Sequence, residues 1–149
     1  MKTLKESLLD DIDSTLKQGS TSIKDTIKDF LKLNYNRAYK FKISKKVNDN
    51  GLYEVSVPIG LKLTTKNKDL TELTNGLFEF VELYCVELFM CDKLKSLKGL
   101  PKHLKGTLFI YECGLTSLEG CPESINGSFI CQHCNDLTSL EHGPKSIRQ

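Results

Sequence analysis

The sequence contains no long apolar run, and this absence excludes a membrane-spanning helix. No stretch approaches the roughly 18 consecutive apolar residues that a helix needs to cross a bilayer. The first residues, MKTLKESLLDDID, are charged from the start and do not form the apolar segment of a secretory signal peptide. We therefore expect a cytoplasmic protein whose six cysteines are reduced thiols rather than disulfides.

The chain also lacks a strong net charge and the motifs of common catalytic sites. Its formal net charge of +2 is too small to attract nucleic acid or a membrane surface strongly. There is no glycine-rich phosphate loop, no His-x-x-x-His pair, and no Ser–His–Asp or Cys–His arrangement that the spacing supports. Asp10, Asp11 and Asp13 have no accompanying phosphate loop and indicate an ordinary polar helix face. We predict neither an enzymatic activity nor a cofactor.

The charge is distributed unevenly along the 149 residues. Residues 1–69 contain 14 Lys and Arg against 9 Asp and Glu, giving +5, whereas residues 70–149 contain 7 against 10, giving −3. The two parts are therefore expected to have different surfaces. The length is typical of one domain or of two tightly packed lobes, and it is sufficient for a real core.

A repeat of 21 to 24 residues occupies the second part of the chain. Three strings align, beginning LKSLKGLP at residue 94, LTSLEGCP at 115 and LTSLEHGP at 137, and a weaker copy begins LTEL at residue 70. Before three of the L-x-x-L motifs, alternating apolar residues predict a short strand with one buried face. A small, weakly polar residue ends each strand inside the coil: Cys91, Cys113 and Cys134.

This pattern resembles the leucine-rich repeat, L-x-x-L-x-L-x-x-(N/C)-x-L, and most of all the short bacterial or phage-type repeats. The resemblance covers about 80 residues. It implies a short solenoid of about three to four coils, in which each coil buries its apolar edge against the next. We predict an α+β fold in which residues 1–69 form an N-terminal capping region and residues 70–149 form the repeat stack.

A helical pair is expected at the start of the capping region. Apolar residues every four positions predict an amphipathic helix over about 3–17, which Thr3 and Glu6 would begin as a capping box. A second helix is predicted over about 22–33, with Ile27 on its buried face. Together with a hairpin, this pair would cover the first coil of the solenoid.

The hairpin follows the helices. Tyr39, Phe41 and Ile43 alternate with polar residues and predict a half-buried strand with its aromatic side chains in the core. The sequence NDNG at 48–51 is a strong hairpin turn. Apolar residues then keep one parity from 53 to 63, which predicts a second strand with a bend or an edge at its proline and glycine.

The outward positions of the repeat strands form one face of the solenoid, which we call the strand face. In leucine-rich-repeat proteins this face is the usual partner surface, so the resemblance implies a partner protein here. We expect apolar outward residues to stack into an exposed stripe, which typically marks a binding site. The alternative is that residues 1–69 fold back over it. The stripe consists of Phe89, Phe109 and Ile130, and the remaining candidate partner-binding residues are Met90, Tyr111, Glu112, Gln132 and His133.

The string FICQHC at 129–134 contains the only C-x-x-C motif of the chain. A structural zinc site needs four ligands, usually from two such pairs or from histidines at suitable spacing. Cys131 and Cys134 instead occupy inward positions of the repeat, and His133 between them is expected to face the other way. We therefore interpret the motif as part of the repeat and predict no metal site.

A basic run interleaved with aromatic residues lies in the capping region. Such a mixture is typical of single-stranded nucleic-acid binding, but the strand parity directs the aromatic side chains away from the lysines. A solvated face is the simplest interpretation, an acidic protein partner is a second one, and nucleic acid is disfavoured. This secondary basic surface consists of Arg37, Lys40, Lys42, Lys45 and Lys46.

These observations favour a non-catalytic protein–protein interaction module. The repeat style suggests a small inhibitor or adaptor, acting in the host cytoplasm if the chain is viral. One alternative is a homo-oligomeric protein that assembles through an uncapped C-terminal coil. A weaker alternative is a nucleic-acid-binding accessory protein.

Overall fold

The computed structural model describes residues 3–7, 10 and 22–148 of the chain. Residues 4–7 are helical, and Thr3 and Glu6 exchange hydrogen bonds as the predicted capping box. Asp10 is helical as well, and residues 8–9 and 11–17 of the first predicted helix lie outside the described residues. No helix in the described part of the chain has the length and apolar character that crossing a bilayer demands.

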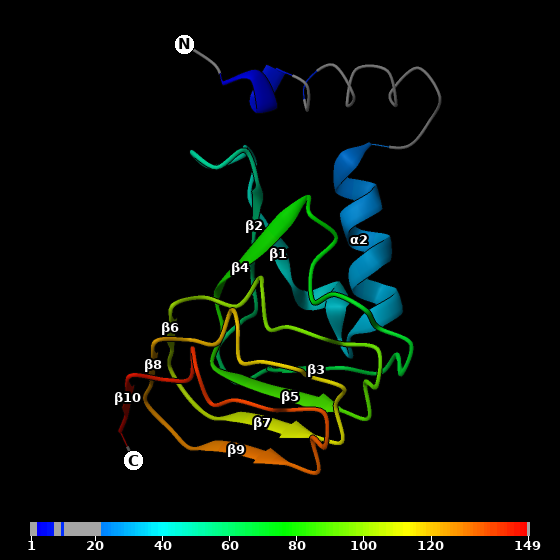
Figure 1. Ribbon diagram of the computed structural model, residues 1–149. Coiled ribbons are helices and arrows are strands. Elements are labelled where there is room, and N and C mark those ends of the chain that lie inside the picture. Colours follow the sequence, from blue (N-terminus) through cyan, green and yellow to red (C-terminus); the bar gives the residue numbers. More distant parts are fainter. Residues whose placement is uncertain (1–2, 8–9, 11–21, 149) are drawn as a thin grey trace.

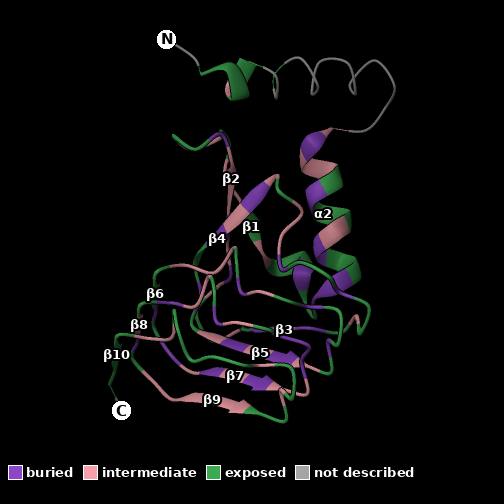
Figure 2. Ribbon diagram, viewed as in Figure 1, coloured by how far each residue is buried: buried purple, intermediate pink, exposed green. Residues whose placement is uncertain are grey.

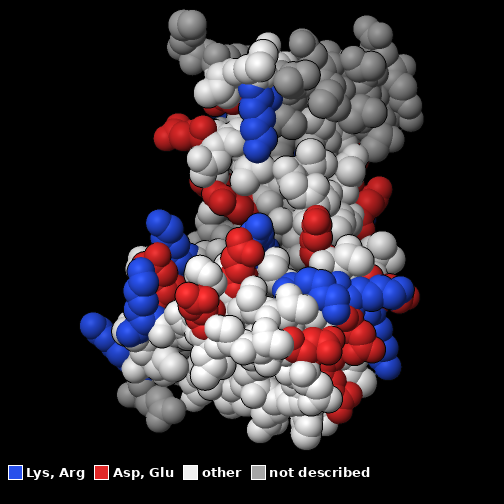
Figure 3. All heavy atoms as spheres, viewed as in Figure 1, with Lys and Arg blue, Asp and Glu red and all other residues white. Residues whose placement is uncertain are grey.

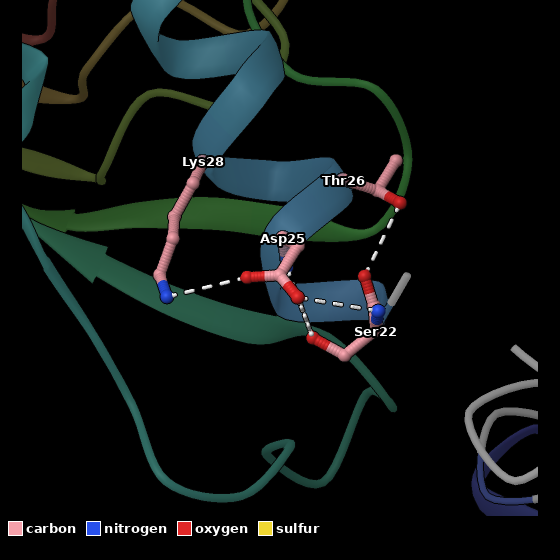
Figure 4. Close-up of polar contacts among 4 residues, drawn as sticks. All are labelled: Ser22, Asp25, Thr26 and Lys28. Carbon is pink, nitrogen blue, oxygen red and sulfur yellow. Dashed lines mark hydrogen bonds and ion pairs between the residues drawn. The ribbon is translucent and has the colours of Figure 1, made fainter. Parts of the chain in front are cut away.

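Helix α2 (Ile23–Asn34) confirms the second predicted helix. The Ser22 hydroxyl accepts a hydrogen bond from the Asp25 amide, and the Asp25 carboxylate accepts one from the Ser22 amide (Figure 4). This reciprocal capping satisfies amide groups that have no partner inside the helix. One face of α2 is buried against the rest of the protein through Ile23, Ile27 and Leu31.

The prediction that a strand starts at Tyr39 is wrong, because the strand begins only at Lys42. Arg37 has a left-handed backbone with φ of +55°, which turns the chain into the 3₁₀ helix η1 (Ala38–Lys40). Tyr39 is therefore 74% exposed instead of lying in the core. The hairpin itself is confirmed, because β1 (Lys42–Ile43) pairs antiparallel with β2 (Tyr53–Ser56).

The single parity predicted from residue 53 to residue 63 is also wrong, because the strand does not continue beyond β2. Pro58 begins a turn in which Gly60 has φ of +86°, and Ile59 between them is 82% exposed. After this turn the chain enters β3 (Lys62–Thr64), which belongs to a different sheet from β2. The predicted bend is therefore a complete break between two strands.

The rest of the chain winds into a β-solenoid of about four turns (Figure 1). Its further strands are β4 (Phe78–Glu82), β5 (Cys85–Phe89), β6 (His103–Leu104), β7 (Leu108–Tyr111), β8 (Ser124–Ile125), β9 (Phe129–Gln132) and β10 (Ser146–Ile147). One side carries a parallel sheet in the order β3-β5-β7-β9, and a second, narrower parallel sheet has the order β10-β8-β6. Strand β4 pairs in parallel with β2 and completes a third sheet with the hairpin.

The main sheet crosses the predicted boundary between residues 69 and 70. Its first strand, β3, comes from the hairpin segment and pairs with β5 of the repeat region. The outer edge of β3 is covered in turn by the residues that follow α2. The Asn36 amide donates to the Thr64 carbonyl at 3.0 Å, and the buried Tyr35 hydroxyl donates to the Leu73 carbonyl. One end of the solenoid is therefore closed by the N-terminal part of the chain.

Aliphatic side chains recur at the same inward positions of successive turns and fill the interior. Figure 2 shows buried residues along β5 and β7 of neighbouring turns. The sequence repeat therefore corresponds to the turns of the solenoid. Fully burying one such side chain contributes about 2 kcal/mol relative to leaving it exposed, so neighbouring turns stabilise each other. The inward residues with at most 1% of their surface exposed include Val86, Leu88, Leu94, Leu97, Leu108, Ile110, Leu115, Leu118 and Ile125.

The three repeat cysteines follow the ends of β5, β7 and β9 and form a ladder along the interior, as predicted. Each thiol donates to the carbonyl oxygen two residues earlier, at 3.2 Å for Cys91 and 3.5 Å for Cys113 and Cys134. Cys91 and Cys113 are buried, whereas Cys134 of the last described turn is half-exposed. A thiol suits this position because it fills the interior and also satisfies a carbonyl at the end of the strand.

Gly114 lies where one turn passes closest to the turn before it. Its amide donates to the Cys91 carbonyl at 3.0 Å, and a Cβ atom at this position would overlap the Asp92 carbonyl oxygen. The turn that contains Gly114 has one residue between its cysteine and its leucine, where the neighbouring turns have two. Glycine therefore permits the shorter connection.

Replacing Gly114 by alanine is expected to lower the free energy of unfolding by at least about 3 kcal/mol, because the overlap is with backbone that cannot rotate away. Gly143→Ala is the matched control. A Cβ at Gly143 would lie 3.0 Å from its nearest neighbour, so we expect a loss below about 1 kcal/mol. Urea unfolding followed by circular dichroism measures both values, and equal values would contradict the close approach of the two turns.

Cys113→Ala is expected to lower the free energy of unfolding by about 2 kcal/mol, because it removes a buried sulfur atom and its hydrogen bond. Cys134→Ala makes the same chemical change in the half-exposed last turn and should cost less than about 1 kcal/mol. The same unfolding measurement compares the two variants. A larger loss at Cys134 would show that the interior does not continue along the cysteine ladder as described.

Candidate functional site

The outward residues of the main sheet lie in rows that run from strand to strand. Parallel pairing places Phe109 of β7 between Glu87 of β5 and Ile130 of β9, and it places Tyr111 between Phe89 and Gln132. Each of these rows takes one residue from β5, one from β7 and one from β9. The pairing of the strands therefore fixes which outward side chains are neighbours on the strand face.

This register corrects the expected stripe. Phe109 and Ile130 are neighbours in one row as expected, but Phe89 belongs to the next row, beside Tyr111. All four side chains are half-buried rather than fully exposed. Counting back two residues from each ladder cysteine gives Phe89, Tyr111 and Gln132, so the sequence did contain the correct alignment.

Four rings form a continuous aromatic cluster across β5, β7 and the end of β9. The ring centroids of Phe89 and Phe109 are 5.3 Å apart, and those of Phe109 and Tyr111 are 6.3 Å apart with the rings nearly parallel. The Tyr111 ring meets the His133 ring edge-on at 5.2 Å. Rings at these distances attract one another, so the cluster is a preformed surface and not a set of independent side chains. Figure 3 shows a largely uncharged area over β7 and β9.

Met90, Glu112 and His133 occupy one shared position, immediately before the ladder cysteine of each turn. Their backbones are left-handed, with φ of +52°, +49° and +55° respectively. Such a backbone costs a non-glycine residue about 1 kcal/mol or more. The turn places these three side chains at the rim of the strand face, where Met90 and His133 are exposed and Glu112 is half-buried.

A basic pocket borders the strand face beside β3. It encloses about 450 Å³ and is lined by Asn36, Arg37, Gly60, Lys62 and Thr64. The Lys62 ammonium donates to the Glu87 carboxylate at 2.6 Å, and this contact raises the pKa of Lys62. Arg37, which the sequence placed on a separate basic surface, is therefore next to the strand face.

An acidic pocket borders the strand face after the ends of its strands. It encloses about 410 Å³, and its lining includes Asp92, Glu112, His133 and Asp136. The Glu112 carboxylate raises the pKa of the Tyr111 hydroxyl. His133 belongs to both the aromatic cluster and the acidic pocket, and Glu87, which accepts from Lys62 of the basic pocket, pairs in register with Phe109. Sequence reasoning missed Lys62, Asp92 and Asp136, because nothing local to these residues relates them to the strand face.

The remaining basic residues form a separate, exposed surface. Lys40, Lys42, Lys45 and Lys46 are all exposed, as is Arg37. The Lys40 ammonium lies 5.9 Å from the centre of the exposed Tyr39 ring. Because η1 replaces the expected strand here, the strict separation of lysines from aromatic residues that the sequence suggested is wrong at Tyr39.

The thiols of the C-x-x-C motif lie in the last described turn. Cys131 and Cys134 are half-exposed, and burial raises the pKa of Cys131 to about 12. The neighbouring Cys113 thiol lowers the pKa of Cys91 to about 7. The Cys91 side chain is fully buried, however, so a substrate would not reach its sulfur atom. Among the described residues, no three or more histidine, cysteine or acidic side chains form a group that holds a metal ion.

Comparison with known proteins adds no assignment to this geometry. The chain matches no protein-family model, no curated protein and no solved structure. Its function is therefore inferred from the arrangement of its own residues.

Proposed function

We propose that the chain is a non-catalytic protein–protein interaction module of the leucine-rich-repeat type, which binds a partner protein through its strand face. The observation that carries this proposal is the aromatic cluster of Phe89, Phe109, Tyr111 and His133. Large aromatic side chains dominate the binding energy of protein interfaces. A contiguous group of them on the surface of a parallel sheet is typical of a binding surface.

The leucine-rich-repeat assignment is supported by the repeat and by the positions of its residues. Inward leucines recur in register from turn to turn, and a cysteine occupies the N/C position of the repeat after three successive strands. The narrow strands β6, β8 and β10 take the place that helices occupy in longer repeats of this type. This difference is in keeping with a repeat length of only 21 to 24 residues.

The strand face is well suited to binding because its side chains are held in place before a partner arrives. Phe109 and Tyr111 project from a strand that is paired on both sides, so little backbone freedom is lost on association. The basic pocket at Arg37 and Lys62 and the acidic pocket at Asp92 and Asp136 both border the strand face. A partner with the complementary charges beside an apolar centre would be oriented by these pockets.

The left-handed rim residues support the same surface. Met90, Glu112 and His133 each retain a side chain where glycine would relieve backbone strain. Strain that recurs at one position of three successive turns suggests a use for the side chains. We assign them to contacts at the edge of the interface, with the protein acting as a small cytoplasmic inhibitor or adaptor that covers its partner's surface.

A second candidate function is self-association through the last described turn. Leu140 is 74% exposed and Ile147 is 46% exposed, although the equivalent Leu118 and Ile125 of the preceding turn are buried. The other end of the main sheet is covered by residues 34–36. Head-to-tail stacking is therefore blocked at that end, and two copies would pair through their last turns about a two-fold axis.

The strand face is tested by the triple substitution Phe89→Lys, Phe109→Lys and Ile130→Lys. Tagged protein is used to capture partners from cells, and the captured protein is identified by mass spectrometry and titrated against purified variants. We expect affinity to fall by at least about a hundredfold, because charged side chains replace apolar anchors.

The matched control is Leu4→Lys, Leu33→Lys and Val81→Lys, which makes the same changes at exposed apolar residues outside the strand face and its two pockets. Its affinity should stay within a few-fold of the original chain. Circular dichroism and thermal unfolding verify that both variants fold. Undiminished binding by a folded strand-face variant would refute the assigned surface.

Self-association is tested by light scattering over a concentration series. We expect dimers that dissociate on dilution, and we expect Leu140→Glu with Ile147→Glu to give monomers, since facing carboxylates would repel across the two-fold axis. A strict monomer at high concentration excludes this second function. Larger open assemblies would instead contradict the two-fold pairing.

A further inference from the structure

A groove separate from the strand face lies between α2 and the segment that follows it. It encloses about 470 Å³, a size typical of ligand and peptide sites. Its lining includes the buried or half-buried apolar side chains of Leu31, Ala38, Phe41 and Ile43. These side chains belong to α2, η1 and the start of the hairpin, so the packing of three elements creates the groove.

Lysines from α2 form one wall of this groove. Lys24, Lys28 and Lys32 are spaced four residues apart, which places them on one face of the helix with a rise of about 6 Å between successive residues. We call the feature the lysine groove. It combines an apolar lining with a row of positive charges about 12 Å long.

The contacts that these lysines already make leave the row positive. The Lys28 ammonium lies 3.4 Å from the Asp25 carboxylate, but both side chains are about half-exposed, and ion pairs of this kind contribute little (Figure 4). The Lys24 ammonium donates to the carbonyl of Lys45 at 3.1 Å, which neutralises no charge. Asp25 therefore compensates one lysine at most.

The opposite wall adds an exposed aromatic ring. Tyr39 lines the groove while 74% of its surface remains exposed, and Lys40 extends over its ring. A large apolar side chain in this position is available to contact an occupant. The 3₁₀ turn of η1 directs Tyr39 to the groove instead of into the core.

We propose that the lysine groove binds an acidic amphipathic segment of a partner protein. Carboxylates on alternate residues of an extended chain are about 7 Å apart, and those on residues four apart in a helix are about 6 Å apart. Either spacing matches the row of lysines. In an extended chain the apolar side chains between the carboxylates project from the opposite face, so they would contact the wall that carries Tyr39 while the carboxylates contact the lysines.

Other anionic ligands fit the groove less well. A single phosphate or carboxylate would engage one or two lysines and leave the apolar lining without a partner. Single-stranded nucleic acid has phosphates at a suitable spacing, but it binds mainly by stacking bases on aromatic rings. Of the two aromatic rings in the lining, Tyr39 is exposed and Phe41 is half-buried, and Leu31, Ala38 and Ile43 are aliphatic, so successive bases find a single exposed ring to stack on. The chemistry of the groove therefore favours a peptide.

The proposal is tested with the full chain and short fluorescent peptides, by anisotropy at low and at moderate salt. The probe is a peptide in which glutamate alternates with leucine. One control peptide replaces leucine by serine, a second replaces glutamate by glutamine, and a thymidine oligonucleotide represents nucleic acid. We expect the glutamate–leucine peptide to bind at least about tenfold more tightly than every control, and its binding to weaken as salt screens the charges.

Variants locate the binding site. Lys28→Glu with Lys32→Glu should weaken binding of the probe at least about tenfold, since it reverses two charges of the row. Lys98→Glu with Lys102→Glu applies the same change of net charge to exposed lysines of the solenoid and should change binding less than about twofold. Thermal unfolding verifies that both variants fold.

Three results would overturn the proposal. The first is no binding of the probe at low salt, and the second is tighter binding of the oligonucleotide than of the probe. The third is an equal loss of binding in the groove variant, Lys28→Glu with Lys32→Glu, and in its solenoid control. The strand-face variant, in which Phe89, Phe109 and Ile130 are replaced by lysine, tests whether the two binding surfaces are independent. It should retain binding of the probe, so that a result against the strand face does not count against the lysine groove, or the reverse.

Discussion

Close stacking of successive turns is the constraint on which the rest of this structure depends. Strands β3, β5, β7 and β9 pair in parallel, and adjacent strands of such a sheet are about 4.8 Å apart. At that spacing the inward leucines and thiols of one turn must fit directly against those of the next. The same spacing excludes a side chain at Gly114, where the backbone of Asp92 is too near.

The proposed binding surface on the strand face follows from this stacking. Since the inward residues fix the register of the strands, the outward residues are aligned as well. Phe109 therefore lies between Glu87 and Ile130 as a consequence of strand pairing alone. The aromatic cluster is rigid because the sheet beneath it is rigid.

The N-terminal part of the chain closes one end of the stack and adds a surface of its own. Tyr35 and Asn36 cover the edge of β3, while α2 packs its apolar face against the protein. The polar face of α2 then meets η1 and the hairpin, and this meeting produces the lysine groove. The two proposed binding surfaces therefore have different origins. The strand face comes from the repeated turns, and the lysine groove comes from the N-terminal cap that the first turn requires.

The sequence by itself determined the turns of the solenoid, the ladder of cysteines and the second helix, because these depend on short periodic patterns and on a local capping box. Only the tertiary structure decided which outward residues are neighbours, where Tyr39 points, and that β3 belongs to the main sheet. A turn at Arg37, which alternation along the sequence does not reveal, redirects the chain, as does a complete break at Pro58–Gly60, where the sequence indicated a bend or an edge. The pockets and the lysine groove join residues distant in sequence, so they exist only once the elements have packed.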